Sequence, residues 1–97
     1  MVNVSYVYIL VSKKGGTLYV GVTTDLAGRV WQHKTGELRG FTSRYGVKRL
    51  VYYEAHGSVE SAITREKSLR RWRGKWKLQL IERDNPDWRN LNREIIK

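Results

Sequence analysis

Residues 4–22 read VSYVYILVSKKGGTLYVGV, and this stretch contains two strand-like segments around a turn. Residues 4–11 and 17–22 are rich in β-branched and aromatic side chains, which is typical of strands. Between them, Lys13-Lys14-Gly15-Gly16 predicts a turn, because Gly tolerates positive φ. Two such strands with a Gly-rich turn between them predict a β-hairpin.

Side chains on a strand alternate between its two faces, so each strand of this hairpin has two distinct sides. On the first strand we expect one side to carry Tyr6, Tyr8 and Leu10 and the other to carry Val7, Ile9 and Val11. The hairpin can then bring Tyr8 and Tyr19 into one neighbourhood. Taken alone, the pair is interpreted as ordinary strand tyrosines with buried rings and solvated hydroxyls.

The rest of the chain predicts helices at 26–34, 59–73 and 75–83, a strand at 49–54, and a short helix within 88–97. Thr24 or Asp25 can cap the first helix and Gly36 can end it. Ser58 caps the second helix, and Gly74 is expected to interrupt the chain before the third. This order predicts one α+β domain over residues 1–97, with a small sheet covered by helices.

The charge balance indicates the class of partner. The chain has 97 residues, of which 19 are Lys or Arg and 9 are Asp or Glu, giving a formal net charge of +10. Such a protein is expected to bind polyanions, nucleic acid first and an anionic membrane second. The alternative is a generic basic surface on a ribosome-associated protein.

Composition excludes or disfavours several classes of protein. The chain has no Cys, which excludes a disulfide scaffold, a thiolate zinc site and a thiol nucleophile. No apolar run approaches the roughly 20 residues that cross a bilayer, and residues 1–5 lack the features of a signal peptide. We therefore expect a soluble, cytoplasmic protein, and of the two polyanions we choose nucleic acid rather than a membrane as its partner.

The first helix carries Arg29 and His33, whose i, i+4 spacing puts them on one face. Arg offers a fork of donors that suits a phosphate, and His can shuttle a proton near neutral pH. Leu26 and Val30 lie close to the same stripe, so the pair is expected at the edge of the buried face. The alternative is a solvated Arg beside a satisfied surface His.

The second helix places a carboxylate in an apolar stripe. The stripe contains Val59, Ala62, Ile63 and Leu69, and Glu66 falls within it, almost two turns after Val59. A carboxylate that faces the core is costly unless it is paired or bound to metal. Glu66 is therefore expected either to form a salt bridge with Arg29 or to hold a divalent cation beside a phosphate.

Basic residues with interleaved tryptophans follow Glu66. They include Lys67, Arg70, Arg71, Arg73, Lys75, Lys77 and Arg83, with Trp72 and Trp76 between them. Such a surface can bind phosphates and stack on unpaired bases. The alternative is a solvated helix face whose tryptophans belong to the core, and we expect Trp76 in the core because Leu80 is its i+4 neighbour.

Together these residues resemble the GIY-YIG nuclease superfamily. Tyr6-Val7-Tyr8 stands where that superfamily has Gly-Ile-Tyr, and Tyr19-Val20-Gly21 stands where it has Tyr-Ile-Gly. Arg29, His33 and Glu66 follow in its order. Residues 40–46 and 65–73 resemble its small, single-domain bacterial branch, which is similar to the nuclease domain of the bacterial excision-repair endonuclease.

The resemblance implies a three-stranded antiparallel sheet flanked by helices, and Mg²⁺- or Mn²⁺-dependent hydrolysis of a phosphodiester. It implies that Tyr8 or Tyr19 accepts the proton of the attacking water, with a depressed pKa favoured by nearby cations. Arg29 would stabilise charge on the phosphate, His33 would position or relay a proton, and Glu66 would hold the metal. Asn85, or alternatively Asn90, would match an Asn that the family uses after the Glu helix.

We therefore predict a metal-dependent endonuclease that acts on DNA, with RNA as the alternative substrate, and that is either slow or structure-selective and linked to repair or recombination. Its predicted nucleic-acid contacts are Lys34, Arg44, Lys67, Arg70, Arg71 and Arg73, with Tyr6, Gly21 and Asn85 supporting the site. Tyr6 replaces the first Gly of the signature and is expected to crowd the floor of the site. A protein partner or a homodimer would then supply target choice. The alternatives are a non-catalytic nucleic-acid-binding module and a structural partner of a repair or ribosomal assembly.

Overall fold

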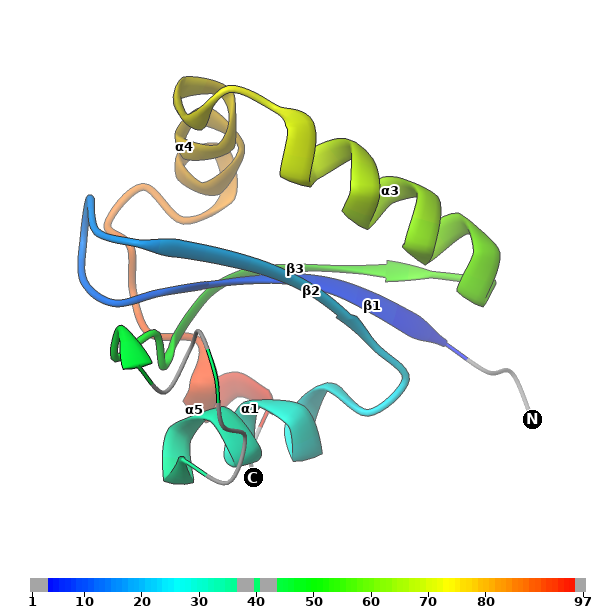
Figure 1. Ribbon diagram of the computed structural model, residues 1–97, viewed down its shortest axis with the longest axis horizontal. Helices are drawn as coiled ribbons and strands as arrows, with labels where there is room; N and C mark the ends of the chain where they lie inside the picture. The colour runs from blue at the N-terminus through cyan, green and yellow to red at the C-terminus, as the bar shows by residue number, and fades with distance from the viewer. Residues whose placement is uncertain (1–3, 37–39, 41–43, 96–97) are drawn as a thin grey trace.

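The structure is a computed structural model that describes residues 4–36, 40 and 44–95. Its elements, in chain order, are β1 (Ser5–Val11), β2 (Leu18–Thr23), α1 (Leu26–Thr35), β3 (Arg49–His56), α3 (Val59–Arg71), α4 (Gly74–Asp84) and α5 (Asn92–Ile95) (Figure 1). The motif expected at residues 40–46 lies partly outside the described residues, because it includes positions 41–43.

The three strands form one antiparallel sheet in the order β2-β1-β3. This arrangement confirms the predicted α+β fold and its hairpin. Tyr8 in the central strand lies opposite Gly21 on β2 and opposite Tyr53 on β3. Because β2 has a neighbour on one side only, its outer edge is accessible to groups from both faces of the sheet.

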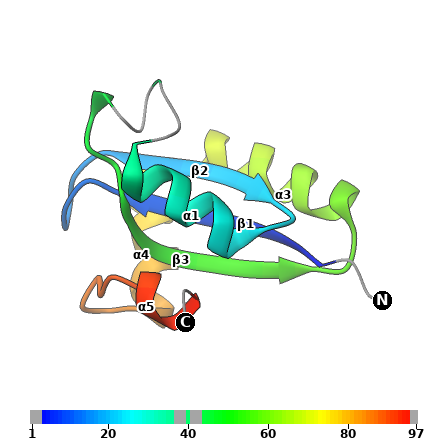
Figure 2. The same cartoon turned by 90° about the horizontal axis from the view of Figure 1, so that it is seen from below.

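Helices cover both faces of the sheet. α3 and α4 lie on one side, and α1 and α5 lie on the other (Figure 1). Figure 2 shows the second side, with α1 in front of the sheet and α3 behind it. Each face has its own hydrophobic cluster: Val7, Ile9 and Val11 pack under α3 and α4, whereas Tyr8 and Leu10 pack against α1. The predicted alternation of side chains along β1 is confirmed.

The predicted helix caps are largely confirmed. The Asp25 carboxylate accepts a hydrogen bond from the Gly28 backbone N–H at 3.1 Å, and Gly36 ends α1 with a φ of 77°. Ser58 accepts from the Ser61 N–H at 3.1 Å and begins α3. These contacts satisfy donors and carbonyls that a helix end leaves unpaired.

The break between the two long helices was predicted at the wrong residue. α3 ends at Arg71 rather than Arg73, and the chain turns at Trp72 and Arg73, each with a ψ of 146°. Gly74 is the first residue of α4 instead of the interruption. β3 also continues past the predicted residue 54 to His56.

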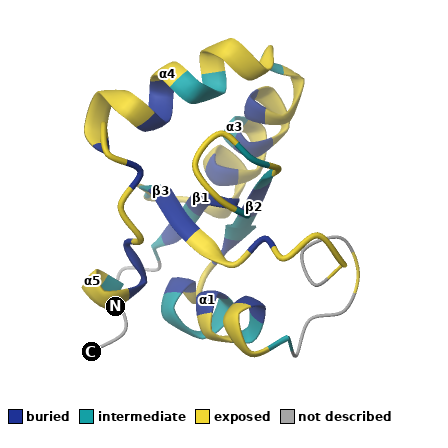
Figure 3. Cartoon of the chain, turned by 90° about the vertical axis from the view of Figure 1, so that its left-hand side faces the viewer, coloured by how far each residue is buried: buried dark blue, intermediate teal, exposed yellow. Residues whose placement is uncertain are grey.

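Two burial predictions were wrong. Val59 and Ile63 are exposed, so the stripe of α3 that faces the sheet consists of Ala62, Glu66 and Leu69. Trp76 is 50% exposed, because α4 turns Leu80 and Ile81 toward the sheet instead. Figure 3 shows this division along α4, with exposed residues on its outer side. None of the helices within the described ranges is long and apolar enough to cross a membrane.

Candidate active site

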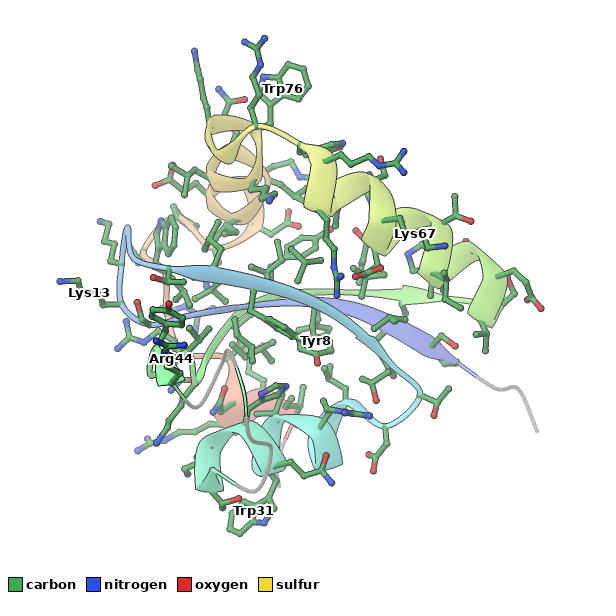
Figure 4. The ribbon with its side chains drawn as sticks, viewed as in Figure 1. Tyr8, Lys13, Trp31, Arg44, Lys67 and Trp76 are labelled. Atoms are coloured by element: carbon green, nitrogen blue, oxygen red, sulfur yellow. The ribbon has the colours of Figure 1, made fainter. Side chains whose placement is uncertain are left out.

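The two tyrosines of the hairpin meet on the face of the sheet that carries α1 (Figure 4). The ring centroids of Tyr8 and Tyr19 lie 6.3 Å apart. Tyr8 extends from β1 across β2, and its hydroxyl end lies directly over Gly21, where any Cβ atom would overlap it. Gly21 therefore allows the Tyr8 hydroxyl to reach toward the outer edge of the sheet.

His33 completes an aromatic group with these tyrosines. Its Nε2 atom lies 3.2 Å from the Tyr8 hydroxyl, and its ring lies 5.5 Å from the Tyr19 ring. His33 is buried, so the surface histidine considered as an alternative is not what the structure has. Arg29 is half-buried one helical turn earlier on α1.

The surroundings change the pKa of two of these groups in opposite directions. Burial raises the pKa of Tyr8 far above its ordinary value, the neighbouring Tyr19 adds to this, and the positive charges of Arg29 and Arg70 act against it. Burial lowers the pKa of His33, and the charge of Arg29 lowers it further. The predicted depression of the tyrosine pKa is therefore wrong for Tyr8, while His33 is neutral near pH 7 and can accept a proton.

Glu66 lies on the other face of the sheet, where α3 packs against β1 and β2. The residue is 6% exposed, which confirms that its carboxylate faces inward. The salt bridge expected with Arg29 is not formed; Glu66 Oε1 instead pairs with Arg70 Nε, one turn later on the same helix. An i, i+4 carboxylate–guanidinium pair partly compensates for the burial of the charge.

Arg70 connects the two sides of the sheet electrostatically. Arg70 reaches β2, where its Nη2 lies 3.5 Å from the carbonyl oxygen of Val20. From there its charge acts on the Tyr8 phenol, which lies over Gly21 on the opposite face. Arg29 from α1 acts on the same phenol, so guanidinium groups from both layers of helices influence the Tyr8 hydroxyl.

The donor set limits the kind of metal site that is possible. Within residues 4–36, 40 and 44–95, no three acidic or histidine side chains gather closely enough to form a metal cage. Mg²⁺ usually keeps several waters and needs only one or two carboxylates plus substrate oxygens. A carboxylate can accept at both oxygens, so the pairing of Glu66 with Arg70 through Oε1 is compatible with a cation of this kind.

Two residues expected to support the site are used elsewhere. Tyr6 meets Tyr53 of β3 edge to face with ring centroids 6.4 Å apart, lines a hollow beside the start of α1, and packs against the hydrophobic cluster that contains Tyr8. The Asn85 side chain donates to the carbonyls of Val51 and Arg89 and accepts from the Arg89 N–H. Asn85 is therefore an architectural residue that fixes the turn after α4.

The six predicted nucleic-acid contacts divide between the two layers. Lys34 lies in the last turn of α1 and Arg44 follows that helix, whereas Lys67, Arg70, Arg71 and Arg73 belong to α3 and its end. All six residues are exposed to solvent, and Arg70 also forms an ion pair with Glu66. The basic residues thus come from both layers of helices, and Arg70 has a contact with β2.

One polar cluster was missed in the sequence. Glu54 on β3 accepts a hydrogen bond from Tyr52 at 2.5 Å and pairs with Arg65 at 3.2 Å and with His56. Burial alone would raise the pKa of Glu54, but these partners lower it below its ordinary value. The alternation of residues 52, 54 and 56 was the available signal. The cluster ties α3 to β3 and leaves the β2 side of α3 for the site.

The fold and these paired tyrosines place the chain in a known class of domain. A family model described as the GIY-YIG catalytic domain matches residues 4–79. This is most of the chain, which therefore belongs to the GIY-YIG family.

Within that family the chain is similar to the small UPF0213 proteins. It is 34% identical over 91 residues to one from Clostridium perfringens, covering 94% of this chain and 97% of the relative. It is 35% identical over 77 residues to one from Haloquadratum walsbyi, covering 79% and 85%. The solution NMR structure of a UPF0213 protein from Bacillus halodurans has 31% identity, a TM-score of 0.57, and 97% and 99% coverage.

Proposed function

We propose that the protein is a metal-dependent endonuclease that hydrolyses phosphodiester bonds in DNA, with selectivity for branched or damaged structures that arise in repair or recombination. The observation that carries this proposal is the position of Arg70, which pairs with the buried Glu66, lies beside the Val20 carbonyl of β2, and acts electrostatically on the Tyr8 phenol that contacts His33. A purely structural hairpin would need neither a histidine buried against its tyrosine nor a carboxylate buried under its helix.

Tyr8 and His33 form the proton-accepting part of the proposed mechanism. The lowered pKa of His33 favours its neutral form. In the proposed mechanism this neutral ring carries its proton on Nδ1, so that Nε2 accepts from the Tyr8 hydroxyl, 3.2 Å away. As water attacks phosphorus, the water proton passes to the Tyr8 oxygen while the Tyr8 proton passes to His33. This exchange removes the need for a free phenolate, which the raised pKa of Tyr8 disfavours.

Cationic side chains stabilise the charge that develops on the phosphate. Arg29 approaches from α1 and Arg70 reaches the β2 edge from α3. Preorganised cations of this kind stabilise a transition state more than a ground state, because negative charge on the phosphoryl oxygens grows as the new bond forms. Tyr19, half-buried beside Tyr8, orients the attacking water.

Glu66 would hold Mg²⁺ or Mn²⁺ together with phosphate and water oxygens. A cation bound there would supply stabilisation of the leaving oxygen. The role of Glu66 itself is to fix a single negative charge at the edge of the sheet, and Arg70 restrains the orientation of its carboxylate.

A non-catalytic nucleic-acid-binding module is the second candidate. The observation in its favour is the burial of Tyr8, which is 2% exposed and therefore has little surface available to a substrate. In this alternative the basic helices bind DNA and no bond is cleaved.

The variant Glu66→Gln separates the two candidates, because it removes the charge and keeps the shape of the side chain. Loss of a metal ligand worth several kcal/mol should reduce Mn²⁺-dependent cleavage by about 100-fold or more. Binding to the same DNA, measured in EDTA, should change little. Substrates should include duplex, single-stranded, flapped and branched DNA.

Glu60→Gln is the matched control, since Glu60 is an exposed glutamate in the first turn of the same helix. It should cleave as the parent protein does. Full cleavage by Glu66→Gln would remove Glu66 from the mechanism. Binding without cleavage by the parent protein, on every substrate and with either metal, would favour the binding module.

A further inference from the structure

Two tryptophans form a ridge at the junction of α3 and α4. The Trp72 and Trp76 rings meet edge to face with centroids 6.3 Å apart. Trp72 is half-buried, and the guanidinium of Arg65 lies 5.0 Å from its ring centroid. Trp76 is 50% exposed and projects from α4 away from the sheet (Figure 4). Trp76 therefore presents a large aromatic surface that the core does not use.

Hollows lie on both sides of this ridge. One, of about 510 Å³, is bounded by Lys67, Arg71 and Arg73 together with both tryptophans. The other, of about 390 Å³, lies between the tryptophans and Arg83. Their volumes fall in the range of small-ligand sites. Among the described residues that line either hollow, none is acidic.

An aromatic face with cations on both sides and no acid matches the chemistry of a single nucleic-acid strand. Successive phosphates need cations, and an unpaired base needs a flat apolar partner. A duplex would satisfy the cations, but its bases are stacked on each other and cannot use the indole. An exposed Trp between Arg and Lys therefore favours unpaired nucleotides over paired ones.

We propose that Trp76, supported by Trp72, stacks on an unpaired base of single-stranded DNA, with Lys67, Arg71 and Arg73 contacting its phosphates. The inference rests on the proposed nuclease function and names its substrate class: DNA with a single-stranded segment next to the cleavage position. Arg71 follows Glu66 by five residues, about 7.5 Å along the helix axis. A strand held on the ridge thus reaches the β2 edge within a few nucleotides.

Equilibrium binding in EDTA tests this without cleavage. The probes are a fluorescent oligothymidine and a blunt hairpin duplex carrying the same number of phosphates. Trp76→Ala should weaken oligothymidine binding by about 10-fold, the effect of losing one base–aromatic stack, and leave duplex binding nearly unchanged. Trp76→Phe keeps an aromatic face and should retain most of the affinity. Melting curves of each variant check that it is folded.

The matched control is Trp31→Ala. Trp31 is 48% exposed, close to the exposure of Trp76, but it lies on α1 on the opposite side of the molecule (Figure 4). Its removal should leave both probes unaffected. Equal losses with Trp31→Ala and Trp76→Ala would overturn the proposal, as would an equal loss on both probes with Trp76→Ala alone.

Two further measurements identify other occupants. A Trp76-dependent dimer in sedimentation without DNA would make the ridge a self-interface and overturn the proposal. Tighter Trp76-dependent binding to oligouridine than to oligothymidine would overturn the assignment to DNA.

Cleavage that persists without any preference for single strands would refute this inference alone. If binding shows a Trp76-dependent preference for single strands but the protein cleaves none of the substrates with either metal, the nuclease function is refuted and the stacking site remains.

Discussion

The hydrogen-bonded pair of Tyr8 and His33 shows how one buried contact can adjust two groups for opposite roles. Burial favours the neutral form of each side chain, so it raises the pKa of the phenol and lowers the pKa of the imidazole. The phenol keeps its proton in the resting protein, and the imidazole is ready to accept one. General base catalysis by such a pair contributes about 10²- to 10⁴-fold to a rate.

The proposed role of His33 predicts the acid limb of the pH profile. Only neutral His33 can accept the Tyr8 proton, and its pKa lies below the ordinary 6.5. The midpoint of the acid limb should therefore lie below pH 6.5, and cleavage should decrease by about tenfold per pH unit below the lowered pKa. The unfolded chain protonates His33 near 6.5 and the folded protein does so at lower pH, so the free energy of unfolding should also fall as the pH decreases through this window.

The measurement is an NMR titration of the His33 ring beside the pH–rate profile. The chain has two His, so His56→Gln leaves His33 as the single signal and should not move the acid limb. An acid limb at or above pH 6.5, or one that does not coincide with the His33 titration, would contradict the role proposed for His33.

At the scale of elements, β2 is the strand that organises the site. Its position at the edge of the sheet exposes the Val20 carbonyl to Arg70, and Gly21 leaves room for the Tyr8 hydroxyl. A Gly within a strand often marks a place where another group approaches the backbone closely. At Gly21 that group is the Tyr8 side chain, which extends from β1 over β2.

Replacement of Gly21 by Ala tests this passage. The added methyl would overlap the Tyr8 hydroxyl end and displace the ring from His33. We expect destabilisation by about 1–3 kcal/mol from overpacking, and a loss of cleavage greater than the loss of stability can explain. Gly57→Ala is the control, because a Cβ there meets no atom within 4 Å. Normal cleavage by a folded Gly21→Ala protein would refute the requirement for this geometry.

Local sequence signals predicted where the helices and strands lie along the chain. They predicted less well which residues of each helix face the sheet. The caps Asp25, Gly36 and Ser58 act within one turn of the chain, so the sequence contained all of the information that they require. The buried stripe of α3 was only partly predicted, because the register of Val59 and Ile63 against the sheet depends on where the helix lies over it. Trp76 was placed in the core for the same reason: the turn at Trp72 and Arg73 rotates α4 and moves Trp76 outward.

At the scale of the whole molecule, the site depends on two layers that pack on opposite faces of one sheet. The sequence predicted that Tyr8, Arg29, His33 and Glu66 belong together, but this grouping came from resemblance. The i, i+4 spacing of Glu66 and Arg70 was visible in the sequence, yet Arg29 was considered as the partner. Only the layer arrangement shows that Arg29 approaches from one face and Glu66 from the other.

The net positive charge of the chain could attract DNA in two ways. Specific side chains on one face could contact its phosphates, or the long-range field of the whole molecule could attract it without defined contacts. Log affinity for duplex DNA falls with log salt concentration, and the slope reflects the number of phosphate contacts. If Lys67, Arg71 and Arg73 contact phosphates, changing all three to Ala should make this slope less steep by about 0.9 for each contact. A control that changes the exposed Lys13, Lys14 and Lys48 to Ala removes charge at the hairpin turn and before β3 (Figure 4). Both variants lower the formal net charge from +10 to +7, so a long-range field would weaken equally in each. Binding titrated in EDTA from about 50 to 200 mM salt should show the reduced slope in the first variant and a nearly unchanged slope in the second. Equal slopes in the two variants would mean that net charge alone attracts the DNA, and that α3 does not form the binding face.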